Sequence, residues 1–169
     1  MMLAVLLLAQ AVAVPTPTWK LADRTNAAGV RSVSAAVIGF DGLSRLVVKC
    51  DVSQESIVSM QFLQPTPLGS GEKPVGVRFD NGFANSYPWR SAGNGVYVSD
   101  PEAVTALTTL LAKAKTVTVE TTNASNFAVQ ANFPAPDSDA MIRQVLGVCG
   151  YTLGVVPPLP PAAPTEEEQ

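Results

Sequence analysis

Few residues of this sequence are of the types that do chemistry. Histidine is absent from all 169 residues, which removes the most common general base and the most common transition-metal ligand. The two cysteines, Cys50 and Cys149, lie far apart along the chain, which excludes a local Cys-x-x-Cys metal or redox motif. Neither a zinc site nor an activated cysteine nucleophile is therefore expected.

The acidic side chains lie where structural roles are expected of them. Asp137 and Asp139 stand at the start of one predicted helix, Asp100 at the start of another, and Asp80 in a predicted turn. Short carboxylates at such positions accept hydrogen bonds from nearby backbone N–H groups. A pair of glycosidase-type acids and a calcium loop are the alternatives, but residues 137–139 lack the glycine and the spacing of a calcium loop. We therefore expect no enzyme and no cofactor or metal.

The amino terminus has the composition of a signal peptide. Residues 2–14 are uncharged and largely apolar, and they are fewer than the roughly 20 residues that a membrane-spanning helix needs. Residues 11–13 supply the small-x-small pattern of a cleavage site. We predict that residues 1–13 are a signal peptide, that the mature bacterial protein is periplasmic or secreted, and that it retains no integral membrane segment. Because no basic residue precedes Lys20, a buried amino-terminal strand is the alternative.

Export determines how the two cysteines are interpreted. Cysteines in oxidising compartments usually pair. We predict a disulfide between Cys50, in a predicted strand, and Cys149, at the end of a predicted helix. The alternative is two separate buried thiols.

The carboxyl end differs in composition from the rest of the chain. Residues 151–169 contain five prolines and three consecutive glutamates, a composition that predicts a disordered, Pro-rich acidic tail. The chain has a net charge of -3, and without Glu166, Glu167 and Glu168 it has 11 basic and 11 acidic residues. A neutral body argues against a nucleic-acid partner, which would require a basic surface.

Residues 14–150 have the pattern of one α+β domain. One helix is predicted after Asp100, with Pro101 as its first residue. A second helix is predicted after Asp137 or Ser138, and it should end before Gly150. The prolines and glycines of residues 64–74 predict a loop. Strand patterns cover residues 33–40, 44–50, 56–63, 75–79, 83–89, 95–99, 116–122 and 127–133. We expect a single antiparallel β-sheet of about seven or eight strands, with two short helices packed on it and one disulfide.

The segment RFDNGFANSYPW, residues 78–89, contains the clearest turn signal. With a two-residue turn its aromatic side chains form an exposed surface, whereas with a three-residue loop of Asp80, Asn81 and Gly82 they join the buried face. The second register gathers more apolar surface, which favours it. We expect this register, with Gly82 left-handed and Trp89 in the core.

Several short motifs together resemble a group of bacterial envelope proteins. These are the leading Trp19, RLVVKC at residues 45–50, VRFDNG at residues 77–82 with Trp89 after it, and a helix that ends in VCG. The chain resembles small secreted or periplasmic proteins of unknown function, and more loosely the type VI secretion-associated accessory proteins. The resemblance implies a disulfide-stapled envelope domain with a structural turn, and a place beside a secretion system, but no activity.

An exported domain without catalytic groups is expected to act by binding. We predict contacts with another, unidentified envelope protein through the strand that holds Tyr87, Pro88 and Arg90, because proline is tolerated where a sheet ends and a free strand edge accepts a partner strand. The alternative is a carrier of small apolar ligands in the periplasm. Its pocket would be lined by Phe62, Phe79, Phe127 and Phe133.

Overall fold

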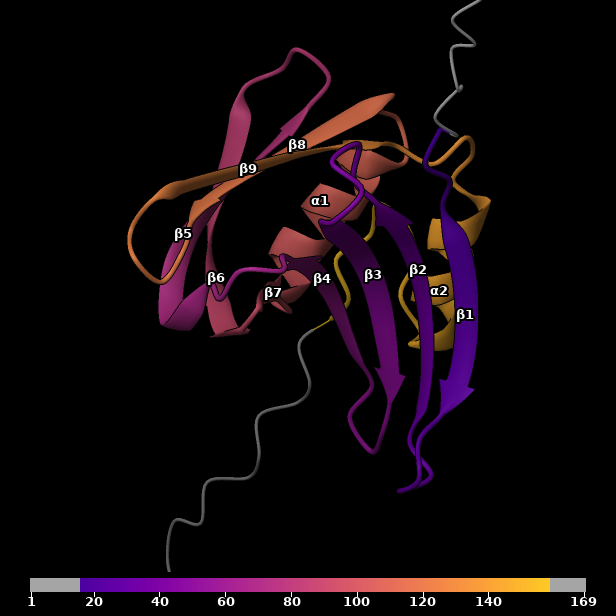
Figure 1. The fold of residues 1–169 in the computed structure, drawn as a ribbon. Coiled ribbons are helices and arrows are strands. Elements are labelled where there is room, and N and C mark those ends of the chain that lie inside the picture. Colours follow the sequence, from indigo (N-terminus) through magenta and orange to yellow (C-terminus); the bar gives the residue numbers. More distant parts are fainter. Residues whose placement is uncertain (1–15, 159–169) are drawn as a thin grey trace, which may run out of the picture.

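The computed structural model describes residues 16–158, and Figure 1 shows their arrangement. The predicted signal peptide, residues 1–13, and most of the predicted tail lie outside these residues. The strands are β1 (Lys20–Thr25), β2 (Arg31–Ile38), β3 (Arg45–Val52), β4 (Ile57–Leu63), β5 (Gly69–Phe79), β6 (Ala84–Gly93), β7 (Gly95–Val98), β8 (Thr116–Thr122) and β9 (Ala128–Pro134). The helices are α1 (Pro101–Leu111) and α2 (Ala140–Val148).

All strands belong to one sheet with the order β1-β2-β3-β4-β7-β6-β5-β8-β9, and all neighbours are antiparallel. The predicted fold class is confirmed, with nine strands in place of about seven or eight. The additional strand is β1, and β5 begins at Gly69, so the loop predicted over residues 64–74 is wrong for residues 69–74. That stretch extends the hairpin with β6, whose pairing continues from Arg78–Ala84 to Gly69–Gly93.

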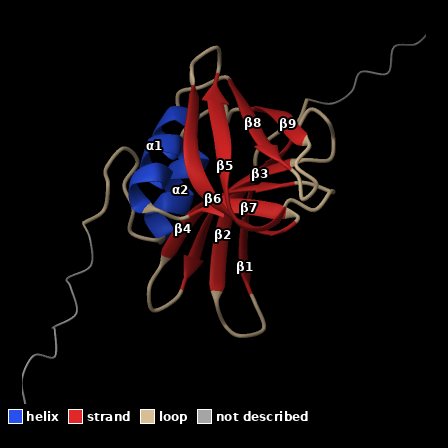
Figure 2. Cartoon of the chain, turned by 90° about the vertical axis from the view of Figure 1, so that its left-hand side faces the viewer, coloured by secondary structure: helices blue, strands red, loops and turns tan. Residues whose placement is uncertain are grey.

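Both helices cover one face of the sheet, as Figure 2 shows. α2 packs on β2 and β3, and α1 packs on β4 and β5. The strands alternate as a half-buried sheet requires, so that Val33, Ala35 and Val37 of β2 are buried while the residues between them face the other way. The core is therefore a layer between this face and the helices, while Ser32, Ser34 and Ala36 on the opposite face of β2 stay partly exposed.

The helix ends follow from local sequence. The Asp100 side chain accepts a hydrogen bond of 2.9 Å from the backbone N–H of Ala103, and Pro101 is the first helical residue, as predicted. α2 is preceded by Asp139, which makes no side-chain cap bond, so the predicted cap at Asp137 or Ser138 is wrong. Gly150 ends α2 in the left-handed conformation, with φ of 76°, as expected.

The β5–β6 hairpin has the expected register but a different turn conformation. Val77 lies opposite Asn85, and Trp89 is fully buried. The left-handed residue is Asp80, with φ of 52°, and not Gly82. Phe83, expected on the buried face, is 98% exposed, because it lies at the tip of the hairpin beyond the reach of the core.

The sheet bends so that β9 crosses the end of β2 (Figure 1). The backbone N–H of Phe40, which follows β2, donates to the carbonyl of Asn132 in β9 at 2.9 Å. The indole N–H of Trp19, which precedes β1, donates to the carbonyl of Pro134 at 2.8 Å. The two ends of the strand order are thus tied together by a few hydrogen bonds.

Candidate functional site

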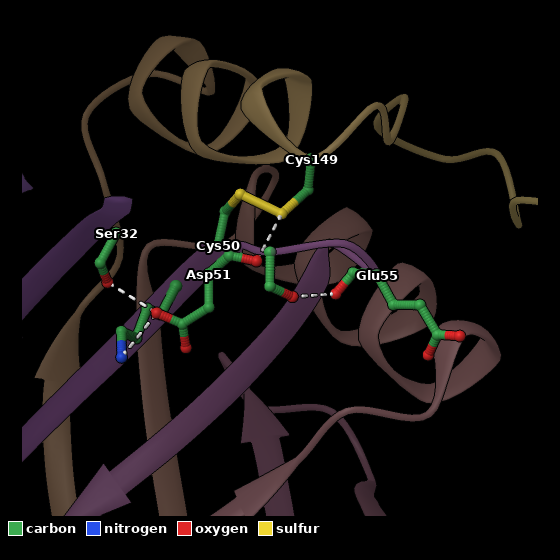
Figure 3. The surroundings of a disulfide bond; sticks show 7 residues. Ser32, Cys50, Asp51, Glu55 and Cys149 are labelled. Carbon is green, nitrogen blue, oxygen red and sulfur yellow. Dashed lines mark hydrogen bonds and ion pairs between the residues drawn. A yellow bond between two sulfur atoms is a disulfide. The ribbon is translucent and has the colours of Figure 1, made fainter. Parts of the chain in front are cut away.

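The predicted disulfide is present. Cys50 of β3 and Cys149 at the end of α2 are bonded, with a Cα–Cα distance of 5.8 Å, and Figure 3 shows the bond and its surroundings. Cys50 is fully buried and faces the helix layer. The bond therefore fixes the carboxyl end of α2 to the helix-facing side of β3. Lys49 and Asp51 lie on the other side of the same strand.

The strand that contains Pro88 is not an edge of the sheet as a whole. β6 lies between β7 and β5, which corrects the prediction that its strand is the edge. However, β7 pairs only with Arg90–Ala92, whereas β5 pairs with the whole of β6. The segment Ala84–Trp89 thus has a strand on one side only, and we call it the open half of β6.

The open half offers a defined set of backbone groups. Pro74 and Pro88 lie opposite each other, and because neither has an N–H they cannot form a hydrogen-bonded pair. Hydrogen-bonded and non-hydrogen-bonded pairs alternate along an antiparallel ladder. Ala84 and Ser86 therefore direct both N–H and C=O away from β5, while Pro88 directs only its C=O there.

The three predicted partner residues are divided between the two halves of β6. Tyr87 is half-buried and Pro88 is exposed, and both belong to the open half. Arg90 is exposed but pairs with Tyr97 of β7, so it belongs to the covered half. Phe83 adds an exposed ring just before the open half, whereas the sequence predicts this side chain on the buried face.

The two outer strands are each partly protected from pairing. β1 carries Lys20, Asp23 and Arg24 within six residues, and charged side chains protect an edge from pairing. On β9, the carbonyls of Asn132 and Pro134 are already occupied by hydrogen bonds. The open half of β6 contains no charged residue.

A second candidate surface, which the sequence did not reveal, lies on the face of β1–β3 opposite the helices. It is a depression of about 910 Å³. The small side chains Ser32, Ser34 and Ala36 of β2 lie in it between longer side chains of β1 and β3. We call this surface the β2 trough.

The walls of the β2 trough are basic. They include Lys20 and Arg24 from β1, and Arg45 and Lys49 from β3. The only acidic lining residue is Asp51, which forms an ion pair of 2.9 Å with Lys49. Within residues 16–158, the other three cations have no ion-pair partner. These residues are far apart in sequence, and only the strand register brings them together, so composition gave no signal.

The predicted turn residue Asp80 has a structural role. Its Oδ1 accepts hydrogen bonds from the backbone N–H groups of Thr116 at 2.9 Å and Lys115 at 2.8 Å. These bonds hold the pKa of the Asp80 carboxyl below its usual value. Asn81 and Gly82 complete the turn, in which the N–H of Gly82 donates to the carbonyl of Phe79 at 3.0 Å. The turn therefore connects the hairpin to β8 and offers no free acid.

Two acids of the predicted helix starts also have structural partners. Asp100 caps α1, and Asp139 forms an ion pair of 2.7 Å with Arg143 on the same helix. Among the described residues, no three His, Cys, Asp or Glu side chains lie together as a metal site would require.

Ser70 and Lys73 have the spacing of a Ser-x-x-Lys motif, which places the two side chains together only on a helix. Here both residues belong to β5, where positions three apart face opposite sides. The Lys73 ammonium instead donates to the carbonyls of Leu68 and Thr122. Lys73 therefore has a structural role, and the two side chains are not placed as a nucleophile and its base.

The four phenylalanines of the predicted ligand pocket do not surround a common space. Phe62 and Phe133 contact each other edge to face with ring centroids 6.1 Å apart, and both are fully buried. Phe127 is 70% exposed at the start of β9. Phe79 is buried as well, so three of the four side chains belong to the core and one faces solvent. The apolar-ligand carrier stays a prediction.

Comparison with known proteins gave no match, since no protein-family model, no curated protein and no solved structure corresponds to this chain. The resemblance to type VI secretion-associated accessory proteins therefore stays a prediction. Neither α1 nor α2, the helices found in residues 16–158, has the length and apolar character that crossing a membrane demands.

Proposed function

We propose that this chain is an exported, non-catalytic envelope protein that acts by pairing with a strand of another envelope protein. The observation that carries the proposal is the open half of β6, an uncharged strand segment that has a neighbour on one side only. Addition of a partner strand to such an edge is a common mode of protein recognition.

The geometry of the open half suits a short partner strand. Six residues extend over about 20 Å, and the outward groups of Ala84 and Ser86 would each form two backbone hydrogen bonds. Phe83 and Tyr87 lie on one face of the strand and Pro88 on the other. Backbone pairing would supply affinity, and these side chains would supply selectivity.

The available side chains support binding over catalysis. The chain has no histidine, both cysteines are in the disulfide, and Asp80, Asp100 and Asp139 have structural partners. Export is supported by the composition of residues 1–13 and by the disulfide, which persists in oxidising compartments. Intact mass of the periplasmic protein should show a chain that begins near Val14; a cytosolic product that retains residues 1–13 would contradict export.

The partner contact is tested by Ser86→Pro. This change removes an outward N–H but no hydrogen bond to β5, so the hairpin should keep its pairing. The matched control is Gln130→Pro, which removes an outward N–H from the uncharged outer strand β9. Capture from periplasmic extract should recover the same partner with wild type and Gln130→Pro, and lose it with Ser86→Pro.

Hydrogen exchange provides a second measurement on the captured complex. The amides of Ala84 and Ser86 should exchange more slowly with the partner bound, because each would donate to the partner strand. Retention of the partner by Ser86→Pro, or equal loss with Gln130→Pro, would contradict the proposal. Identification of the partner as a component of a type VI secretion system would support the accessory role that the sequence resemblance implies.

A further inference from the structure

We propose that the β2 trough binds an extended acidic peptide segment of a partner protein. The surface is separate from the open half of β6, because it lies on β1–β3 and on the face opposite the helices. The proposal therefore assigns a second binding surface, which does not depend on strand addition.

The cations of the trough follow one another in a regular pattern. The register places Arg45 beside Ile38, Lys20 beside Ala36, Lys49 beside Ser34, and Arg24 beside Ser32. Successive cations are thus two residues apart along β2, or about 6.7 Å, and they alternate between β3 and β1. The walls are two strand spacings apart, which is about 9.6 Å. This width admits one extended chain above the small side chains of β2.

An extended peptide with an acid at every second residue matches this pattern. Residues i, i+2, i+4 and i+6 of such a peptide point to the same side, also at steps of about 6.7 Å. With that side facing the trough, successive carboxylates would reach Arg45, Lys20, Lys49 and Arg24 in turn, and the one at Lys49 would compete with Asp51. The floor serines add hydroxyl groups, of which Ser32 already donates to Asp51 at 2.8 Å.

Other anionic chains are less suited to the trough. Single-stranded nucleic acid is held by aromatic side chains on which the bases stack. The lining contains no phenylalanine, tyrosine or tryptophan. Recognition would therefore depend on the charge of the ligand and on its fit to the width of the trough. An acidic peptide meets both requirements and needs no aromatic side chains for stacking.

Charge complementarity argues for an occupant from another protein. The lining carries four cations and one acid, whereas the chain without Glu166–Glu168 is balanced, so basic charge is concentrated here. The acidic end of this same chain would also complement it. However, Tyr151 and Leu153 pack against the core, and Gly154 lies beside Thr109 of α1, so residues 151–154 run along the helix side, opposite the trough.

The test uses the full mature chain and a capped peptide of four Glu-Ser repeats, with four Gln-Ser repeats as the control peptide. Binding is followed by shifts of the amide resonances of Ser34 and Ala36 at about 0.01 M salt, where the screening length is about 30 Å. The Glu-Ser peptide should shift these resonances, and the effect should disappear at about 1 M salt, where that length is about 3 Å. The Gln-Ser peptide should not shift them.

Variants locate the contact. Lys20→Gln and Arg45→Gln are changes at exposed side chains, and each should weaken Glu-Ser binding by a factor of roughly 1.5 to 5, the range for exposed ion pairs. Lys113→Gln makes the same charge change outside the trough, after α1, and should leave the affinity within a factor of about 1.5. Equal losses in all three variants would overturn the proposal, as would binding of the Gln-Ser peptide.

Two further measurements distinguish other occupants. A chain with Glu166, Glu167 and Glu168 all changed to Gln should keep the wild-type resonances of Ser34 and Ala36 at low salt. A difference there would assign the trough to the chain's own tail and overturn the partner proposal. Tighter binding of a single-stranded oligonucleotide or a sulfated polysaccharide at the same residues would overturn the acidic peptide as the occupant.

Discussion

Loss of the Cys50–Cys149 disulfide should strongly destabilise the fold. The bond closes a loop with a sequence separation of 99 residues. Cys149→Ser is the preferred variant, because Cys149 is half-buried while Cys50 lies fully inside the core. The remaining Cys50 thiol then behaves as a small apolar side chain.

The expected magnitude comes from the entropy of the unfolded chain. A loop of about 100 residues corresponds to about 4.7 kcal/mol in the chain-entropy treatment, compared with a total stability of about 5 to 15 kcal/mol for a typical domain. A body of about 140 residues has an unfolding entropy near 0.3 kcal/mol/K. The melting temperature of Cys149→Ser should therefore fall by about 15 °C.

Urea unfolding followed by circular dichroism measures this loss. The dependence of stability on urea should become steeper in Cys149→Ser, because the unfolded chain without the bond is more expanded and exposes more surface. Reduced wild-type protein is the control and should match the variant. A loss below about 1 kcal/mol would refute the loop-entropy reasoning, and two alkylated thiols in native, unreduced protein would refute the bond itself.

The other predictions concern the turn, the helix cap, the core tryptophan and the strand edge. Asp80→Ala should lower the urea midpoint at neutral pH. The folded pKa of Asp80 lies below its usual value of about 3.9, so its contribution to stability is present above that pH and is lost as the pH falls through the folded pKa. The difference in urea midpoint between variant and wild type should therefore disappear in acid. Asp100→Ala should cost about 1 kcal/mol of unfolding free energy in the same assay. In a Trp19→Phe background, Trp89 fluorescence should be blue-shifted and resist iodide, since Trp89 is 0% exposed. Pro88→Val should promote self-association in sedimentation experiments, because it adds an outward N–H to the open half of β6; a purely monomeric variant would contradict the assigned strand edge.

Local sequence signals were sufficient for several parts of the fold. The Asp100 and Pro101 pair fixed the start of α1, because a capping acceptor and a residue without an N–H both suit that position. The β5–β6 register followed from apolar alternation, since a slip of one residue would have exposed Val77 and Trp89. The predicted left-handed residue of the turn is wrong, because the bonds that hold Asp80 come from Lys115 and Thr116, more than thirty positions away.

Long-range pairing produced the features that the sequence did not predict. β1 reads KLADRT, with five of its six residues exposed, and no apolar period marks it as a strand. It is held by pairing with β2 and by the Trp19 indole bond to Pro134. Without β1 the trough has no second wall, so its arrangement of cations could not be inferred from the positions of lysines and arginines alone.

The open half of β6 follows from two independent sequence features that end the same ladder. If the β6–β7 register continued, Ser99 would lie opposite Pro88, but Pro88 has no N–H to contribute. On the other strand, the chain leaves the sheet after Val98, because Asp100 and Pro101 begin α1. Each feature alone would shorten the pairing. Together they leave the carbonyl of Pro88 and the backbone groups of Ala84 and Ser86 directed away from β5, while the paired part of β7 still holds the covered half of β6 within the sheet.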